Sequence, residues 1–271
     1  MPVAGRDSVM RRRERALVRL MHHGDEPVTV AAWPAGSCVR IRAQAASREA
    51  AGYAVGRMRF ALGLDHDLED FHRAFKLDPL VGPVIRRRPW IRPLRRPEPF
   101  EALAWAITEQ LIEAERAAQI QRRLVYRFGR QSSCGTLRDA PSPAALAARA
   151  PAELEACDLA GKRAIAMVRV AREVAAGRAD LHEHEPTWKR LRSIREIGSW
   201  TIDKLAYHGQ GRDDCIPAGD LAYVKLVGRL AGLGRRGTEE EVRAFFERYA
   251  PYQALAGTYL LMGRFRPAFN R

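Results

Sequence analysis

The stretch Leu191-Arg192-Ser193-Ile194-Arg195-Glu196-Ile197-Gly198-Ser199-Trp200-Thr201 ends one helical pattern and begins another. Before it, Pro186 and Trp188 open a short apolar repeat of helical spacing, and after it a second repeat continues to Gly209. The sequence therefore predicts a helix, a tight hairpin and a second helix over residues 187–209. Peptide N–H groups at such a turn, with the positive end of the second helix behind them, suit a phosphate oxygen.

A short loop, Ile216-Pro217-Ala218-Gly219-Asp220, follows the hairpin and leads into apolar residues at helical spacing. We predict a loop and helix over residues 215–231, with the carboxylate of Asp220 at the mouth of the helix. Asp220 can serve there as an N-cap that accepts the free N–H groups of the first turn. It can also act on a bound molecule, and its own residue type does not decide between these roles.

The hairpin, the loop and the single aspartate together resemble the helix-hairpin-helix (HhH-GPD) DNA glycosylase superfamily. The form Pro217-Ala218-Gly219-Asp220-Leu221 is similar to the 3-methyladenine DNA glycosylase II branch. This resemblance implies a mainly α fold, α+β overall, in which a helical bundle follows a small β-containing N-terminal region. It also implies double-stranded DNA with a damaged base as partner, and hydrolysis of the N-glycosidic bond after base flipping, with alkylated purines as substrates.

Two alternatives to that function stay open. The substrate can be an oxidised or deaminated base, or the chain can be a non-catalytic DNA-binding protein that keeps the hairpin. If the chain is a DNA glycosylase, the resemblance makes Asp220 the catalytic residue. One carboxylate can stabilise the positive charge that builds on the deoxyribose as the base departs, and can position a water. A helix N-terminus favours its ionised form.

The segment Ile107-Thr108-Glu109-Gln110-Leu111 resembles the loop that enters the minor groove in this superfamily. The resemblance makes Gln110 and Leu111 the DNA wedge, with Leu111 filling the gap left by the extruded base. Leu111 also continues an apolar helical stripe from Phe100, so a core position is the alternative. Glu109 stands where relatives often have Gly.

The base pocket implied by the resemblance contains Trp200, Tyr252 and Lys204. The two aromatic rings would lie beside the flipped base, or alternatively would pack in the core. Lys204 stands where related enzymes place an aromatic residue. Members that also cut the DNA strand carry a nucleophilic lysine at the position of Trp200, so no AP lyase activity is expected.

Phosphate contacts are expected from the hairpin and from the turn 157–164 that precedes the next helix: Ile197, Gly198, Ser199, Thr201, Lys162 and Arg163. In the family, hairpin carbonyl groups, here near Ile194 and Ile197, can hold a monovalent cation; no side-chain metal site is expected. Arg195-Glu196 replaces the usual Pro-Gly, which makes the turn less permissive at a positive φ, although Gly198 is retained. Gln253 follows Tyr252 where an Arg often stands.

Composition agrees with a nucleic-acid partner. The 271 residues are 46% apolar, with a formal charge of +14 and a pI near 10.3. The four cysteines, Cys38, Cys134, Cys157 and Cys215, form no C-x-x-C pair, so neither a disulfide framework nor an iron–sulfur cluster is expected. No apolar run reaches the length of a membrane span. We expect a monomeric, cytoplasmic, nucleoid-associated protein of bacterial type, without cofactors.

The remaining chain predicts a small α/β region over residues 1–62 and a helical body over residues 63–271. Residues 28–33 and 38–43 are β-prone, and helices are expected at 48–62, 68–75 and 142–156. Between Val81 and Phe100, five prolines and six arginines indicate a stiff basic connector that cannot be a long helix. Thr238 with Glu241 at the third position indicates a capping box and a further helix.

Overall fold

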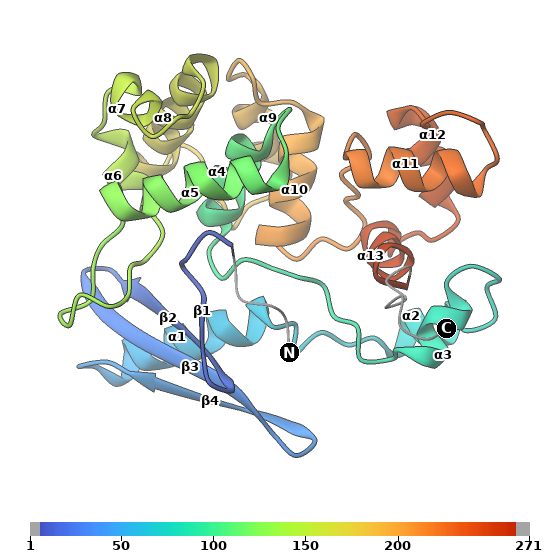
Figure 1. Ribbon diagram of the computed structural model, residues 1–271, viewed down its shortest axis with the longest axis horizontal. Coiled ribbons are helices and arrows are strands. Elements are labelled where there is room, and N and C mark those ends of the chain that lie inside the picture. Colours follow the sequence, from blue (N-terminus) through green and yellow to red (C-terminus); the bar gives the residue numbers. More distant parts are fainter. Residues whose placement is uncertain (1–5, 264–271) are drawn as a thin grey trace, which may run out of the picture.

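The computed structural model describes residues 6–263 and shows a mainly helical protein with an antiparallel sheet near its N-terminus (Figure 1). This confirms the predicted fold class. The ends of the two predicted regions, residues 1–5 and 264–271, lie outside the described residues. The division at residue 62 stays a prediction. Among the described helices, none combines the length and the apolar character needed to cross a bilayer.

Four antiparallel strands form the sheet in the order β1 (Arg11–Arg13), β2 (Ala16–His23), β3 (Glu26–Ala35) and β4 (Cys38–Gln44). The two predicted β-prone runs lie within β3 and β4, whereas β1 and β2 were missed. β2 is buried on both faces and includes the buried Arg19, so it lacks the alternation by which a half-buried strand is recognised. Helix α1 (Arg48–Ala61) covers one face of the sheet.

Arg19 connects the sheet to the helical body through buried charges. Its guanidinium donates to Glu101 at 2.9 Å and to Asp139 at 3.2 Å, and both Arg19 and Glu101 are almost completely buried. Burial alone would lower the pKa of Arg19, but the two carboxylates hold it above its ordinary value. A buried guanidinium is tolerated here because both partners are present.

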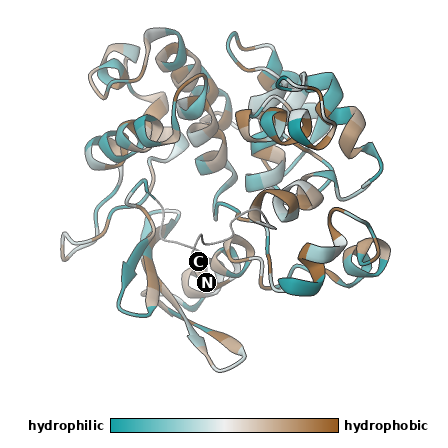
Figure 2. Cartoon of the chain, turned by 45° about the vertical axis from the view of Figure 1, so that its right-hand side comes forward, coloured by the Kyte–Doolittle hydropathy of each residue, from teal (hydrophilic) through white to brown (hydrophobic). Residues whose placement is uncertain are grey.

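The helical body has two hydrophobic clusters, and α10 (Ser199–Gly209) contributes to both. Figure 2 shows apolar and polar residues, in brown and teal, alternating along many of its helices. One cluster gathers α4 (Pro99–Glu109), α5 (Ala114–Phe128), α6 (Pro143–Ala147), α7 (Pro151–Glu155), α8 (Gly161–Ala175) and α9 (Glu185–Arg192).

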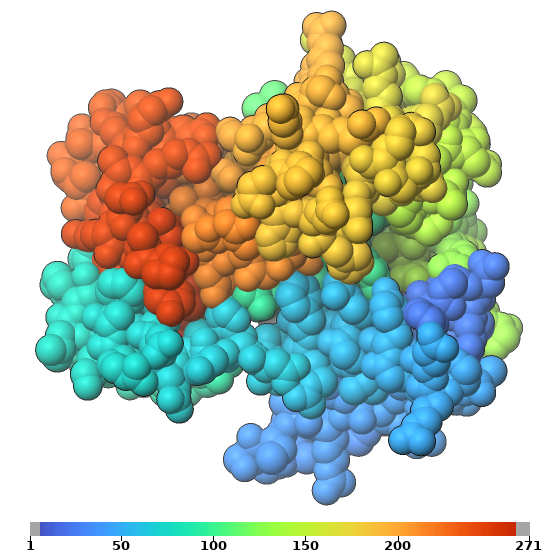
Figure 3. Space-filling model, turned by 180° about the vertical axis from the view of Figure 1, so that it is seen from behind, coloured from blue at the N-terminus to red at the C-terminus, as the bar shows by residue number. Residues whose placement is uncertain are grey.

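The other cluster combines segments that are far apart in the sequence. It contains α2 (Glu69–Phe75), α3 (Gly82–Arg87), α11 (Leu221–Leu230), α12 (Glu239–Glu247) and α13 (Gln253–Gly263). Figure 3 shows the cyan residues of α2 and α3 against the red C-terminal helices. The capping box predicted at Thr238 is confirmed at the start of α12.

One helix prediction was wrong, and the predicted connector has one feature that was not foreseen. The single helix predicted over residues 142–156 is two short helices, α6 and α7, because Pro151 cannot donate the N–H that would continue the first helix. The predicted connector between Val81 and Phe100 contains one short helix, α3, with Pro83 in its first turn. There proline has no intrahelical bond to lose, so the short helix is compatible with it.

Helices α4 and α10 run antiparallel and approach each other closely at Gly209. A Cβ atom built on Gly209 would lie 2.9 Å from the Cβ of Ala102 and 3.0 Å from the Cα of Pro99. At the opposite end of the pair, Gln110 meets Thr201. The absence of a side chain at Gly209 therefore sets the separation of the two helices that carry most of the site described below.

We predict that Gly209→Ala lowers the free energy of unfolding by about 1–3 kcal/mol, because the added methyl group overpacks the contact with α4. Gly52→Ala in α1 is the matched control, since nothing lies within 4 Å of its Cβ position. There the same change should stabilise by about 0.5–1 kcal/mol through helix propensity. Urea unfolding of both variants measures the difference, and equal effects would contradict the close approach.

Candidate active site

The predicted hairpin is present: α9 ends at Arg192 and α10 begins at Ser199. Ile194 and Ile197 are buried beneath the turn, and the N–H of Ile197 donates to the carbonyl of Ile194 at 3.1 Å. The left-handed residue is Glu196, with φ of 75°, whereas Gly198 has φ of −96°. The retained glycine therefore does not relieve the turn, and Glu196 carries a conformational cost of roughly 1–2 kcal/mol.

Gly198 is the N-cap of α10 and has no side chain with which to satisfy the first-turn amides. Those N–H groups have no intrahelical partner and lie at an exposed surface of Gly198 and Ser199. The side chains of Ile197 and Thr201 are buried, so these two residues can offer a phosphate only their main chain. The hairpin thus retains the geometry expected of an anion site.

The predicted wedge lies in the loop between α4 and α5. Helix α4 ends at Glu109, so the apolar stripe does not reach Leu111, which has φ of 54° and a side chain that is 103% exposed. This excludes the alternative that Leu111 belongs to the core. Gln110 does not point outward: its amide donates to the Glu196 carbonyl at 2.8 Å and to the Thr201 hydroxyl at 2.9 Å.

Arg163 supports the same loop from α8. Its guanidinium donates to the carbonyl of Gln110 at 2.8 Å and to that of Thr108 at 3.3 Å. Arg163 was expected to contact phosphate. Its guanidinium instead donates to carbonyl groups at the end of α4, which have no partner within the helix. Lys162, its neighbour, is exposed at the start of α8.

Asp220 is the N-cap of α11, as predicted, and its Oδ1 accepts the N–H of Ala222 at 2.9 Å. Its Oδ2 has no hydrogen-bond partner within residues 6–263. Asp220 lines a cleft of about 960 Å³ between the hairpin, the wedge loop and the start of α11. The cleft therefore brings together six of the predicted residues: Asp220, Trp200, Gln110, Leu111, Gly198 and Thr201.

Another carboxylate that lines this cleft, Glu239, was not predicted. Its Oε1 accepts from the Ser199 hydroxyl at 3.1 Å and from Arg243 at 2.7 Å, which ties α12 to the hairpin helix. Arg243 also donates to the buried Asp203 at 2.7 Å. In the sequence, Glu239 follows the predicted N-cap Thr238, which indicates only an acidic residue in the first turn of a helix. Its position in the cleft results from tertiary packing.

Two of the predicted base-pocket residues lie elsewhere. Tyr252 packs edge-on against Phe71 and Phe75 of α2, at ring distances of 5.6 and 6.4 Å, and does not line the cleft with Trp200. The core alternative holds for this residue, because α2 supplies an apolar surface that the sequence does not place beside it. Lys204 lines a neighbouring hollow and forms an ion pair with Glu109 at 2.9 Å.

Residues 104–251, more than half of the chain, match the HhH-GPD superfamily of base excision DNA repair proteins. The chain belongs to this superfamily. The resemblance drawn from the hairpin and the aspartate loop is thereby confirmed, as is the expectation of a base excision repair glycosylase.

Several curated relatives of this HhH-GPD protein are glycosylases by name. A DNA-3-methyladenine glycosylase of Bacillus subtilis is 24% identical over 73% of this chain and 67% of its own length. DNA-3-methyladenine glycosylase 1 of Schizosaccharomyces pombe is 26% identical over 62% and 74%, and DNA-3-methyladenine glycosylase 2 of Escherichia coli is 28% identical over 65% and 61%.

Solved structures share the fold of this HhH-GPD protein. A 3-methyladenine DNA glycosylase from Archaeoglobus fulgidus aligns with a TM-score of 0.79 at 22% identity, over 95% of this chain and 90% of its own. The S. pombe enzyme, solved in complex with abasic DNA, aligns with a TM-score of 0.60 at 24% identity, over 74% and 98%. These similarities support the fold, and the roles of individual residues rest on the geometry above.

For this HhH-GPD protein we predict that Leu111→Ala weakens binding to DNA with a damaged base by roughly 1–3 kcal/mol, the range of a lost stacking contact. Folding stability should not fall, because the side chain is fully exposed. Fluorescence-anisotropy titration and thermal unfolding of the same preparation test both statements. Unchanged binding would show that Leu111 does not enter the duplex.

Proposed function

We propose that this protein is a monofunctional DNA glycosylase that flips an alkylated purine out of double-stranded DNA and hydrolyses its N-glycosidic bond. The observation that carries the proposal is the position of Asp220, whose carboxylate lines the cleft between the hairpin and the exposed Leu111. The names of the relatives supply the substrate class. A glycosylase for another damaged base remains the alternative.

In this proposal the hairpin and the wedge hold one DNA strand on either side of the damaged nucleotide. The free amides at Gly198 and Ser199 bind a phosphate oxygen, and Leu111 fills the vacated stack. Gln110 fixes the distance between these two elements, because its amide is bonded to the hairpin. The flipped nucleotide then enters the cleft beside Asp220.

Asp220 acts on the sugar rather than on the base. As the base departs with the bonding electron pair, positive charge develops on C1′ and the ring oxygen, and the carboxylate stabilises it at short range. Water attacks C1′, and the proton it loses can pass to Asp220. An alkylated purine in DNA already carries positive charge, so its departure needs no strong general acid. The Ala222 N–H bond at Oδ1 orients the carboxylate.

Asp220→Asn should lower the excision rate by about a hundredfold or more, because the amide keeps the shape and the hydrogen bond to Ala222 but not the charge. Asn is also as good an N-cap as Asp, so stability should change by less than about 0.5 kcal/mol. Single-turnover excision from methylated DNA, together with urea unfolding, measures both. If the variant excised alkylpurines at close to the wild-type rate, Asp220 would be a cap only.

A further prediction concerns strand cleavage. Trp200 occupies the position of the lysine nucleophile, and the ammonium group of Lys204 is held by Glu109. The product should therefore be intact abasic DNA that breaks only after alkali or heat, and borohydride should trap no covalent complex. Borohydride trapping that disappeared in Lys204→Ala would overturn this, and would assign a Schiff base to Lys204.

A further inference from the structure

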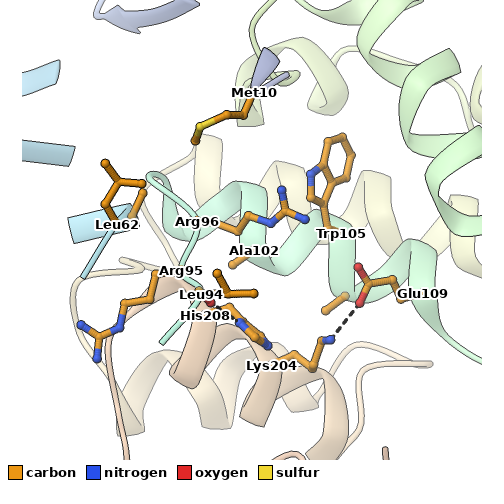
Figure 4. Close-up of a pocket in the computed structure, with 12 residues that line it drawn as sticks. Met10, Leu62, Leu94, Arg95, Arg96, Ala102, Trp105, Glu109, Lys204 and His208 are labelled. Atoms are coloured by element: carbon orange, nitrogen blue, oxygen red, sulfur yellow. Dashed lines mark hydrogen bonds and ion pairs between the residues drawn. The ribbon is translucent and has the colours of Figure 1, made fainter. Parts of the chain in front are cut away.

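A second hollow, of about 270 Å³, lies between α4, α10 and the segment that precedes α4 (Figure 4). Glu109 lines both this hollow and the cleft that contains Asp220. The hollow offers the space of roughly nine water molecules at ~30 Å³ each, which is enough for one base. Its other walls are apolar or basic and include Met10, Leu62, Leu94, Arg96, Ala102 and Trp105. It is therefore placed to receive a base whose sugar lies beside Asp220.

Glu109 and Lys204 form a charged pair where the two hollows meet. Their side chains are 27% and 17% exposed, and Nζ of Lys204 lies 2.9 Å from Oε2 of Glu109. Burial alone would raise the pKa of the Glu109 carboxyl, but the ammonium group of Lys204 holds it below its ordinary value. Figure 4 shows the two side chains pointing toward one another across the hollow. At neutral pH the base would therefore meet a carboxylate beside an ammonium group.

His208 adds no charge to this hollow. Burial, together with the ammonium group of Lys204, lowers the pKa of His208 to about 3. Its neutral ring must then donate the Nδ1 proton to the carbonyl of Leu94, at 2.7 Å. The nearby guanidinium groups are paired as well, Arg95 with Asp213 and Arg96 with Asp7 and Glu101. In the described part of the hollow, the Glu109–Lys204 pair is thus the place where a carboxylate and an ammonium group lie side by side.

Both members of the pair keep free hydrogen-bonding capacity. The ammonium group has three N–H donors, and one of them meets Glu109. The other carboxylate oxygen of Glu109 accepts only a long bond, of 3.4 Å, from Gln121. A donor and an acceptor are therefore offered side by side. Two purine edges complement such a pair. One is the lactam edge of a 6-oxopurine, in which the N1–H donor adjoins the O6 acceptor; the other is the adenine edge, in which the N1 acceptor adjoins the 6-amino donor.

We propose that Glu109 and Lys204 recognise this lactam edge, Glu109 accepting N1–H and Lys204 donating to O6, so that the enzyme prefers lesions of 6-oxopurines to lesions of adenine. The inference rests on the proposed function and names its substrate more closely. A carbonyl oxygen is a stronger acceptor for an ammonium group than a ring nitrogen within a cationic base. The pair would act on the choice of base, whereas Asp220 acts on the sugar.

The distribution of charge in the two common methylated purines favours the same choice. In 7-methylguanine the positive charge lies in the five-membered ring, away from N1. In 3-methyladenine it is shared with the 6-amino group, which would face the ammonium group of Lys204, and like charges in one site repel. The indole face of Trp200 also already meets that ammonium group, whose Nζ lies 5.4 Å from the ring centre. Less of this face remains to attract a cationic base of either kind, so the preference depends on the edge that meets the Glu109–Lys204 pair.

The test compares the kcat/KM values for different lesions within each preparation of the full chain. A smaller fraction of folded protein lowers all of these values equally and therefore does not change their ratios. DNA methylated by dimethyl sulfate supplies 7-methylguanine and 3-methyladenine in one sample. An oligonucleotide with hypoxanthine supplies an intact lactam edge. An oligonucleotide with 1,N6-ethenoadenine supplies an adenine edge that has no N–H donors. The variants are Glu109→Gln, Lys204→Met and the double substitution. Glu153→Gln, which removes the charge of a half-buried carboxylate at the start of α7, is the control.

We expect the pair variants to lower kcat/KM for 7-methylguanine and hypoxanthine by about tenfold or more, with less than about threefold change for 3-methyladenine and ethenoadenine. Glu153→Gln should alter none of the ratios. An equal loss for all four lesions would overturn the proposal, because it would show that the pair only holds α4 against α10. Wild-type protein that excised no lesion would overturn the proposed function itself, and the inference with it.

Discussion

The close packing of α4 against α10 is the constraint on which the site depends. Gly209 allows the start of α4 to approach the end of α10, since a Cβ atom there would collide with Ala102. The opposite ends of the same two helices then carry the contacts of Gln110 with Thr201 and of Glu109 with Lys204. The loop of Leu111, the hairpin and the hollow beside Glu109 and Lys204 are therefore positioned by one helix pair.

Charged residues have different roles on the surface and in the interior of this protein. The formal charge of +14 suits a polyanionic partner, and exposed basic residues such as Lys162 supply part of it. Inside, charged groups are paired: Arg19 with Glu101 and Asp139 joins the sheet to α4. Removing one partner of such a pair costs more than the pair itself contributes, because the other charge is left buried. The buried pairs thus fix the orientation of the N-terminal sheet relative to the site.

Two departures from the superfamily pattern explain each other once they are seen in space. Glu109 stands where relatives often have Gly, and Lys204 stands where related enzymes place an aromatic residue. The two residues are 95 positions apart in the sequence, where each is an isolated departure from the superfamily pattern. The fold places them 2.9 Å apart. A negative charge that would be unfavourable beside DNA becomes the partner of a half-buried ammonium group, so each change compensates for the other.

The sequence by itself determined the elements whose signals are local. The hairpin, the caps at Thr238 and Asp220, strands β3 and β4 and the superfamily all follow from residues within short windows, since turn chemistry and helix starts depend on neighbouring residues. Even there, Pro151 divided a helix that looked continuous, and the left-handed turn residue was Glu196 rather than Gly198.

Tertiary structure decided everything that depends on contact between distant segments. It packed the partly buried Tyr252 against α2, exposed Leu111, and brought Glu239 to the cleft beside Asp220. It also turned Arg163 from an expected phosphate ligand into a support for the wedge loop. The reason is physical: a leucine, a tyrosine or an arginine has the same local pattern in a core and in a site, and only the surface that packs against it distinguishes the two.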